Sequence, residues 1–357
     1  MRSGDESSVD IRYRGEPGHI VSGTVKGVIA AGANISLVRV GESMLPTNST
    51  FQAPDGKGFA FYGVGDGEYD ISAIQSAPGT GNAFPDVSVS ESRRVIVKGN
   101  DVSGVELITK PLGSISGRIV LEPSKLPECQ GKRRPVFSET IVELKRNLKN
   151  PNDQQPAFMR YLSIPTVPDK DGSFVARNSR EGQYAINPKF FARYWYLQAM
   201  SLVTPAAKSP QPNVKVDLAR NWTTLKLGER LTGLTITLAE GAASIKGGLK
   251  VPDGGKRPEK LNVYLVPTER DKLDDPLRFF VAELEADGTF VLNNLAPGRY
   301  WIVTQAPLDP ELASEKLRLP SAAESRLKLR RAAEAGKTEI ELKPCQNVTD
   351  FQLPATQ

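Results

Sequence analysis

The sequence has little of the residue on which many catalytic and metal-binding sites depend: its 357 residues include one histidine, His19. A histidine-based metal cluster is therefore excluded, and a Ser-His-Asp or Cys-His arrangement would have to use that one side chain. The cysteines number two, Cys129 and Cys345, and no apolar run approaches the roughly 20 residues of a membrane-spanning helix. These shortages exclude histidine-metal enzymes, disulfide-dense scaffolds and helical membrane proteins.

Charge is abundant but balanced, with 46 basic and 41 acidic residues and a formal net charge of +5. Basic residues cluster only at Lys132-Arg133-Arg134 and between Arg326 and Arg331, and no aromatic stripe lies among them. Because base stacking needs such aromatic residues, we expect no nucleic-acid partner. The 31 glycines and 27 prolines favour a turn-rich β protein.

Three segments share one spacing, in which a glycine follows a phenylalanine by eight residues and a tyrosine follows that glycine by two. The three sets are Phe59/Gly67/Tyr69, Phe174/Gly182/Tyr184 and Phe290/Gly298/Tyr300. An Asp-Gly pair precedes each phenylalanine, as a turn with positive φ requires. Each segment therefore predicts a strand, a turn and a second strand, whose tyrosine is buried with its hydroxyl on nearby backbone.

Two further strand signals keep register with each copy. Upstream, alternating apolar residues surround a central glycine at Gly23, Gly117 and Gly247. Downstream, closing strands are predicted at 102–107, 231–236 and 348–353. A diverged repeat of this size indicates tandem domains, so the sequence predicts three β-sandwich modules, at residues 17–110, 111–240 and 241–357.

Insertions interrupt the second and third modules. Gly117 and Phe174 lie 57 residues apart, and the excess over module 1 contains a polar loop from Asn147 to Pro156 that should be exposed. In module 3, residues 321–335 begin with capping-box spacing and continue rich in Leu, Ala, Lys and Arg. Gly336 stands where a C-terminal cap belongs, so one helix of about four turns is predicted there.

The order of these signals, G-x-[VIL], then D-G-x-F, then G-x-Y, resembles the carboxypeptidase-regulatory-like family of transthyretin-like β-sandwich modules and the related collagen-adhesin B type. The resemblance covers nearly the whole chain. Module 1 departs from it with one extra residue in Asp55-Gly56-Lys57-Gly58-Phe59, and module 2 has Arg180-Glu181-Gly182 where Pro-Gly is usual. The resemblance implies seven-stranded, Ig-like Greek-key sandwiches of bacterial secreted or envelope proteins, which serve in spacing, adhesion or ligand binding without chemistry of their own.

Residues 8–14 align with a closing strand, because Ile11 lies twelve residues before Gly23 as Val105 lies twelve before Gly117. We therefore expect residues 1–16 to be the terminal strand of a missing upstream module, or an extension, and the natural protein to continue before Met1. A lone strand leaves its backbone unpaired, so we expect an exposed, poorly packed extension unless it docks on module 1 or, by self-association, on a neighbouring chain. No signal peptide opens the chain, which is thus either cytosolic or a fragment.

The sequence predicts no catalytic, cofactor or metal site. Asp169 and Asp171 resemble the first half of a calcium loop, but position twelve is Arg180, which would repel a cation, so a turn is expected. Paired carboxylates for glycoside hydrolysis are not excluded by composition, and no motif supports them. Neither module 2 nor module 3 owns a cysteine pair, so we expect Cys129 and Cys345 to be free thiols, with a bridge between modules as the alternative.

The segment 190–196 has five aromatic residues in seven positions. Because neighbouring strand residues face opposite sides, either Trp195 points outward and stacks on a sugar ring, with Trp222, or the tyrosines are exposed beside Arg193. The plainer alternative is that the core and the insertion cover both faces. The candidate ligand-binding residues are Trp195, Tyr194, Tyr196, Trp222 and Arg193.

Together these features favour a non-catalytic, extracellular or periplasmic spacer or interaction protein, with a protein or cell-surface partner. Carbohydrate binding by the aromatic residues of module 2 is the alternative function. No cofactor is expected in either case.

Overall fold

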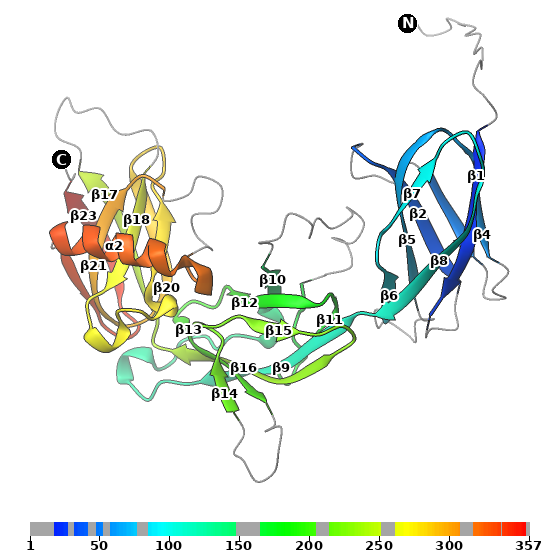
Figure 1. The fold of residues 1–357 in the computed structure, drawn as a ribbon. Coiled ribbons are helices and arrows are strands. Elements are labelled where there is room, and N and C mark those ends of the chain that lie inside the picture. The colour runs from blue at the N-terminus through cyan, green and yellow to red at the C-terminus, as the bar shows by residue number, and fades with distance from the viewer. Residues whose placement is uncertain are drawn as a thin grey trace, which may run out of the picture. The chain divides into compact units, whose positions relative to one another are not determined.

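The computed structural model of the chain describes residues 18–27, 32–41, 48–52, 58–76, 85–147, 165–204, 214–250, 261–307, 317–336 and 338–354. These residues form an all-β sandwich protein, which confirms the predicted fold class (Figure 1). The described residues divide into two compact units, the first ending at Leu112 and the second beginning at Gly113.

The repeated sequence pattern corresponds to a repeated set of strands. We call residues 18–111 the first repeat, 113–240 the second repeat and 243–354 the third repeat. The opening strands are β1 (His19–Lys26), β9 (Gly113–Glu122) and β17 (Ala243–Lys250). The phenylalanine strands are β4 (Phe59–Val64), β11 (Ser173–Ser179) and β20 (Thr289–Leu295). The tyrosine strands are β5 (Gly67–Ser76), β12 (Gly182–Phe190) and β21 (Gly298–Gln305). The closing strands are β8 (Val102–Pro111), β16 (Arg230–Glu240) and β23 (Asn347–Pro354).

The other elements differ from one repeat to the next. The first repeat adds β2 (Ala33–Arg39), β3 (Asn48–Gln52), β6 (Val87–Ser90) and β7 (Arg93–Val97). The second repeat adds β10 (Thr140–Arg146), β13 (Trp195–Thr204), β14 (Val214–Asp217), β15 (Thr223–Leu225) and two 3-10 turns, η1 (Pro127–Cys129) and η2 (Phe137–Glu139). The third repeat adds β18 (Asn262–Pro267), β19 (Phe280–Glu283), β22 (Glu339–Leu342), α2 (Ala323–Gly336) and the turns η5 (Arg270–Lys272), η6 (Pro276–Arg278) and η7 (Pro320–Ala322).

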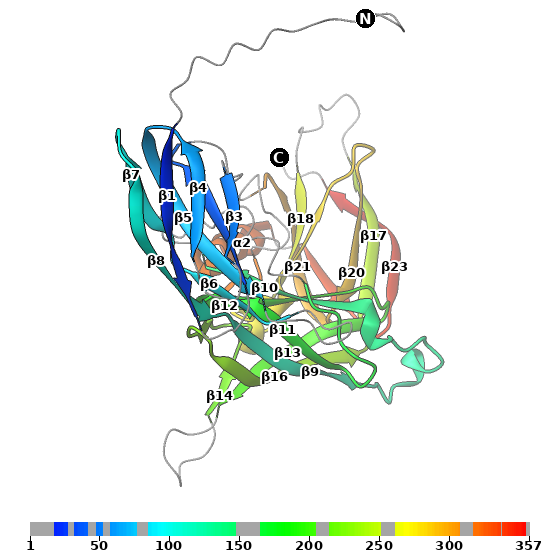
Figure 2. The ribbon, with the colours of Figure 1, turned by 90° about the vertical axis from the view of Figure 1, so that its right-hand side faces the viewer.

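In every repeat the opening strand pairs antiparallel with the phenylalanine strand and parallel with the closing strand. The first unit is one eight-stranded sheet that folds over its core, because β6 pairs with both β5 and β8 (Figure 2). The second repeat has sheets β10-β12-β15 and β11-β9-β16-β13-β14, and the third has β20-β17-β23 and β19-β18-β21-β22. The described ranges thus hold eight, eight and seven strands, so the seven implied by the resemblance are found only in the third repeat.

Each opening strand approaches its closing strand closely at one glycine. The pairs are Gly23 with Val105, Gly117 with Leu234 and Gly247 with Phe351. Just before each pair the closing strand has a one-residue bulge, whose left-handed residues are Gly104, Gly233 and Asp350, with φ of 74°, 89° and 59°. A Cβ atom on Gly23 would lie 1.9 Å from the carbonyl oxygen of Val105. The central glycine of the pattern is therefore required by a backbone contact.

The repeated aromatic residues form the centre of each sandwich, as predicted. The phenylalanines, Phe59, Phe174 and Phe290, and the tyrosines, Tyr69, Tyr184 and Tyr300, are all buried. Each tyrosine hydroxyl donates to the carbonyl oxygen four residues earlier, in Gly65, Arg180 and Ala296, at 2.7 to 2.9 Å. The predicted tyrosine corner is thus confirmed in all three copies.

Helix α2 confirms the helix predicted at 321–335, and it begins after the turn η7. It lies across the sheet that contains β18 and β21 (Figure 1). Val263 and Leu265 of β18 face the sandwich core, while Tyr264 packs with Leu329 of the helix. Both faces of β18 are therefore buried.

The predicted Asp-Gly turns are present in the second and third repeats. The carboxylate of Asp171 accepts from the amide of Ser173 at 3.2 Å, and that of Asp287 accepts from the amide of Thr289 at 2.8 Å. The turn expected at 169–172 is therefore confirmed, and the amide of Gly172 donates to the carbonyl oxygen of Asp169 at 2.9 Å. The Asp55-Gly56 turn, residues 1–16 and the polar loop after Asn147 lie outside the described residues.

The glycine contact predicts different outcomes for two adjacent residues. A Cβ on Gly247 would lie 2.4 Å from the Phe351 carbonyl oxygen, whereas a Cβ on Gly248 would come no closer than 3.5 Å to Gly288. Gly247→Ala should lower the free energy of unfolding by about 1–3 kcal/mol, as overpacking does. Gly248→Ala is the matched control and should change it by less than about 0.5 kcal/mol. Urea denaturation measures both, and equal effects would contradict the contact.

Burial predicts an alkaline loss of stability through one tyrosine. Burial raises the pKa of Tyr300 to about 12, against an ordinary value of 10.0. The unfolded chain loses this proton first, so between those values each pH unit lowers the free energy of unfolding by about 1.4 kcal/mol. Tyr300→Phe should remove this component of the slope between about pH 10 and pH 11. Tyr62→Phe, at a residue 73 % exposed, should keep the wild-type slope, and an unchanged slope in Tyr300→Phe would refute the prediction.

Candidate functional site at the junction of the second and third repeats

Trp195, the first residue of β13, is fully buried in the core of the second repeat. The aromatic segment thus takes the second of the two arrangements considered, with Trp195 inward. A fully buried ring cannot stack on a ligand, so Trp195 leaves the set of candidate binding residues. Trp222 is half-buried, and no ring contact or hydrogen bond joins it to Tyr194 or Tyr196 in the described ranges.

The two tyrosines belong to the contact with the third repeat. Tyr196 packs against the core of that repeat, and the guanidinium carbon of Arg278 lies 5.6 Å from the centre of its ring. In return, Leu277 of η6 joins the core of the second repeat. The third repeat therefore covers the face that the sequence analysis assigned either to solvent or to the insertion.

Tyr194 precedes β13 in a left-handed backbone conformation, with φ of 68°, which is rare for an aromatic residue. Its carbonyl oxygen accepts from the amides of Gly241 and Ala242, at 2.8 and 2.9 Å. Its hydroxyl accepts from Nδ2 of Asn347 at 3.1 Å. The surrounding hydrogen bonds thus hold both ends of this residue, which is how a strained conformation persists.

Two cationic side chains flank the Tyr194 ring. Nζ of Lys132 lies 5.0 Å and Cζ of Arg193 lies 5.2 Å from the ring centre, within range of cation–π attraction. Arg193 also donates to Oδ1 of Asn347 at 3.2 Å, and the Ser244 hydroxyl donates to the same oxygen at 2.8 Å. The hydrogen bond from Asn347 lowers the pKa of Tyr194, and the charges of Arg193 and Lys132 add to this effect.

A disulfide joins Cys129 to Cys345 at this junction, with Cα atoms 5.4 Å apart. The expectation of two free thiols was therefore wrong, and the alternative, a bridge between repeats, is what the structure has. No sequence pattern marks the pair, because its members lie 216 residues apart in different repeats. Lys132 follows one half of the bridge and Asn347 follows the other, so the bridge brings both to Tyr194.

A further hydrogen-bonded contact completes the junction. Nδ2 of Asn294 donates to the carbonyl oxygens of Ala192 and Trp195, at 2.8 and 2.7 Å. Asn294 is left-handed, with φ of 57°, at a bulge in β20, and Asn178 has φ of 56° at the matching position of β11. A bulge residue of the third repeat therefore binds backbone carbonyl groups of the second repeat.

His19 lies between two carboxylates in the first unit. Its Nε2 is 3.3 Å from Oδ1 of Asp66, and its Nδ1 is 3.9 Å from Oδ1 of Asp101. Both carboxylates also accept backbone amide bonds, from Gly99 and Ile20. In the described ranges no group of three or more metal-ligating side chains occurs, and no helix is long and apolar enough to cross a membrane.

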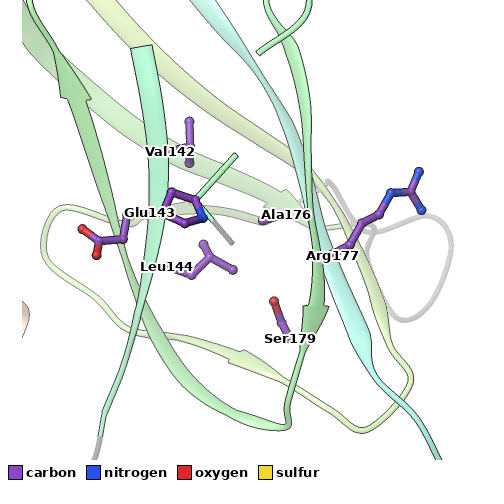
Figure 3. A pocket seen from close by; sticks show the side chains of 7 residues that line it. Val142, Glu143, Leu144, Ala176, Arg177 and Ser179 are labelled. Carbon is purple, nitrogen blue, oxygen red and sulfur yellow. The ribbon is translucent and has the colours of Figure 1, made fainter. Parts of the chain in front are cut away.

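A small pocket of about 70 Å³ lies between β10 and β11 in the second repeat (Figure 3). Val142 and Leu144 line it from β10, and Ala176 and Ser179 line it from β11. The charged ends of Glu143 and Arg177 point away from one another in the figure. The pocket therefore offers no paired acid and base, and it is a weaker candidate than the junction.

No family model matches this chain, and no match is found among curated proteins. Among solved structures it is similar to the Bacillus anthracis TIE protein, with 10 % identity over 96 % of this chain and 52 % of that one, at a TM-score of 0.21. It is also similar to a minor pilin of Streptococcus agalactiae, with 11 % identity over 68 % of this chain and 100 % of that one, at 0.29. The major pilin subunit of Bacillus cereus has 11 % identity over 94 % of this chain and 98 % of its own, at 0.21.

The chain thus spans about half the length of the Bacillus anthracis protein. At these TM-scores the likenesses carry no argument about activity, and the resemblance to the carboxypeptidase-regulatory-like family rests on the sequence motifs alone.

The disulfide predicts a loss of stability on reduction. Cys129→Ser/Cys345→Ser should lower the free energy of unfolding of the second unit by about 2–5 kcal/mol, as loss of a bridge across a long loop does. Dithiothreitol should have the same effect on the wild type and none on the double variant. Thiol titration of the denatured wild type should find two thiols only after reduction, and two free thiols before reduction would refute the bridge.

Proposed function

We propose that the chain is a non-catalytic, extracytoplasmic spacer or interaction protein, an array of three tandem β-sandwich modules with the boundaries predicted from the sequence. The observation that carries this proposal is the buried disulfide between Cys129 and Cys345. Structural disulfides form and persist in oxidising compartments and are rare in the cytosol. The bridge therefore supports an extracellular or periplasmic location. The resemblance of the sequence motifs to modules of secreted and envelope proteins supports the same location.

The repeated frame supports the structural part of the role. The three repeats use the same pairing of opening, phenylalanine and closing strands, and each has its own buried core. Stacked modules of this kind space a binding surface from its anchor. The junction between the second and third repeats supplies such a surface, with a protein or cell-surface partner.

Carbohydrate binding is the second candidate function, and the composition of the junction favours it. Phe191 is 75 % exposed, Arg193 is exposed and Tyr194 is half-buried, so aromatic and charged groups are displayed together. Aromatic rings and arginine are enriched at recognition surfaces for the contact area and directional hydrogen bonds that they provide. With Trp195 buried, the surface for a glycan is the rim of the junction.

Thiol trapping in the cells that make this chain tests the proposed location. A membrane-permeable maleimide added before lysis and kept present during denaturation should leave both cysteines of the wild type unmodified, and the chain should fractionate with the envelope or the medium. Cys129→Ser is the matched control, because it frees Cys345, which should be labelled after denaturation. Full labelling of the wild type in the cytosolic fraction would refute an extracytoplasmic role.

A further inference from the structure

The junction gathers positive charge that its own acids do not neutralise. In the described part of the chain, neither Lys132 nor Arg193 forms an ion pair with a carboxylate, whereas the adjacent Arg133 is paired with Glu139. The hydroxyl of Tyr194 accepts a bond from Asn347 and, within the same ranges, donates none. Two cations and one hydroxyl proton are thus available around a single ring.

These groups are close enough to act on one ligand. The distances of 5.0 and 5.2 Å to the ring centre place the two cationic centres at most about 10 Å apart, roughly one Debye length at 0.1 M salt. Their fields therefore add in the solvent around the ring and raise the local concentration of anions.

The groups are also held in place before any ligand arrives. Asn347 fixes the guanidinium of Arg193 and is itself fixed by Ser244. The disulfide ties the segment that contains Lys132 to the segment that contains Asn347. A preorganised site loses little conformational entropy on binding, so even a small set of donors can be effective.

We propose that Lys132, Arg193 and the hydroxyl of Tyr194 bind the carboxylate or phosphate group of an acidic polysaccharide. This inference rests on the proposed function, since it names the partner of the interaction surface. The planar guanidinium of Arg193 presents paired donors to an oxyanion, and the lysine adds a compact positive charge. The Tyr194 hydroxyl donates a third hydrogen bond to the same group.

The surroundings favour a sugar polymer over nucleic acid. Phe191 lies two residues before Arg193 and exposes 75 % of its surface, so it offers one apolar ring close along the chain to the cationic site. One ring and one oxyanion site match a single acidic sugar unit. Binding of single-stranded nucleic acid would need successive stacking rings along a basic groove.

Binding of the full, oxidised chain to immobilised polygalacturonate tests the site, with neutral dextran as the reference surface. Lys132→Ala/Arg193→Ala should weaken binding at least about tenfold, because it removes both cations. The matched control is Lys26→Ala/Arg118→Ala, which removes two exposed cations that are paired with Glu106 and Asp171. Since both double variants lower the net charge equally, the control should stay within about twofold of the wild type.

Several results would overturn the site. Equal weakening by both double variants would mean that net charge alone drives binding. Equal binding of the wild type to polygalacturonate and to dextran would refute the acidic polysaccharide as the ligand. Tighter binding to DNA at the same salt, lost in the junction variant, would assign the surface to nucleic acid. Phe191→Ala should weaken binding to polygalacturonate but not to inorganic phosphate, and an equal result for both would indicate a free anion.

Two controls separate a failed site from a misfolded protein or a failed function. Tyr194→Phe keeps the ring and the cation–π contacts but loses the hydroxyl, which is both the donor to the ligand and the acceptor of the bond from Asn347. It should weaken polygalacturonate binding about threefold while lowering the free energy of unfolding by no more than about 1 kcal/mol. Unchanged binding by this variant would show that the hydroxyl does not bind the ligand. The junction variant should keep its disulfide and its envelope location, so loss of those would count against the proposed function, whereas loss of polymer binding alone supports the site.

Discussion

The close approach of the opening strand to the closing strand is the constraint on which each sandwich depends. At Gly23, Gly117 and Gly247 the strands meet where a carbonyl oxygen occupies the place of a side chain. The bulge that directs this oxygen also separates the two pairing registers of the closing strand. The phenylalanine opposite each glycine then fills the core directly beneath the contact.

The repeated arrangement of strands also explains how the second and third repeats join. Each phenylalanine strand also has a one-residue bulge, where Gly63, Asn178 or Asn294 adopts a left-handed conformation. In the third repeat the bulge residue is an asparagine whose side chain binds the carbonyl oxygens of Ala192 and Trp195. The bulge requires only a residue that tolerates a left-handed backbone, and in the third repeat the asparagine side chain also contacts the second repeat. The disulfide and Tyr194 also join the same two repeats.

Local sequence patterns predicted the repeated strands of each sandwich, but they did not predict the contacts between the second and third repeats. The glycine, phenylalanine and tyrosine of each copy are identified by spacing because each answers a requirement within one sandwich, and α2 is identified by its composition. The pairing of Cys129 with Cys345, and that of Tyr194 with Asn347, involve residues more than 150 positions apart. No periodicity records such contacts. Period-two alternation also left the direction of Trp195 open, because Tyr194 lies in a turn rather than in the strand.

The disulfide changes how the chain would transmit a pulling force applied to its ends. Tension that enters the second repeat through β9 passes from Cys129 directly to Cys345 and leaves through β23. The 215 residues between the two sulfur-bearing positions, out of a separation of 216, then carry no load. Most of the second and third repeats would keep their length while the first unit stretched, so the bridged pair of repeats acts as a short, inextensible link.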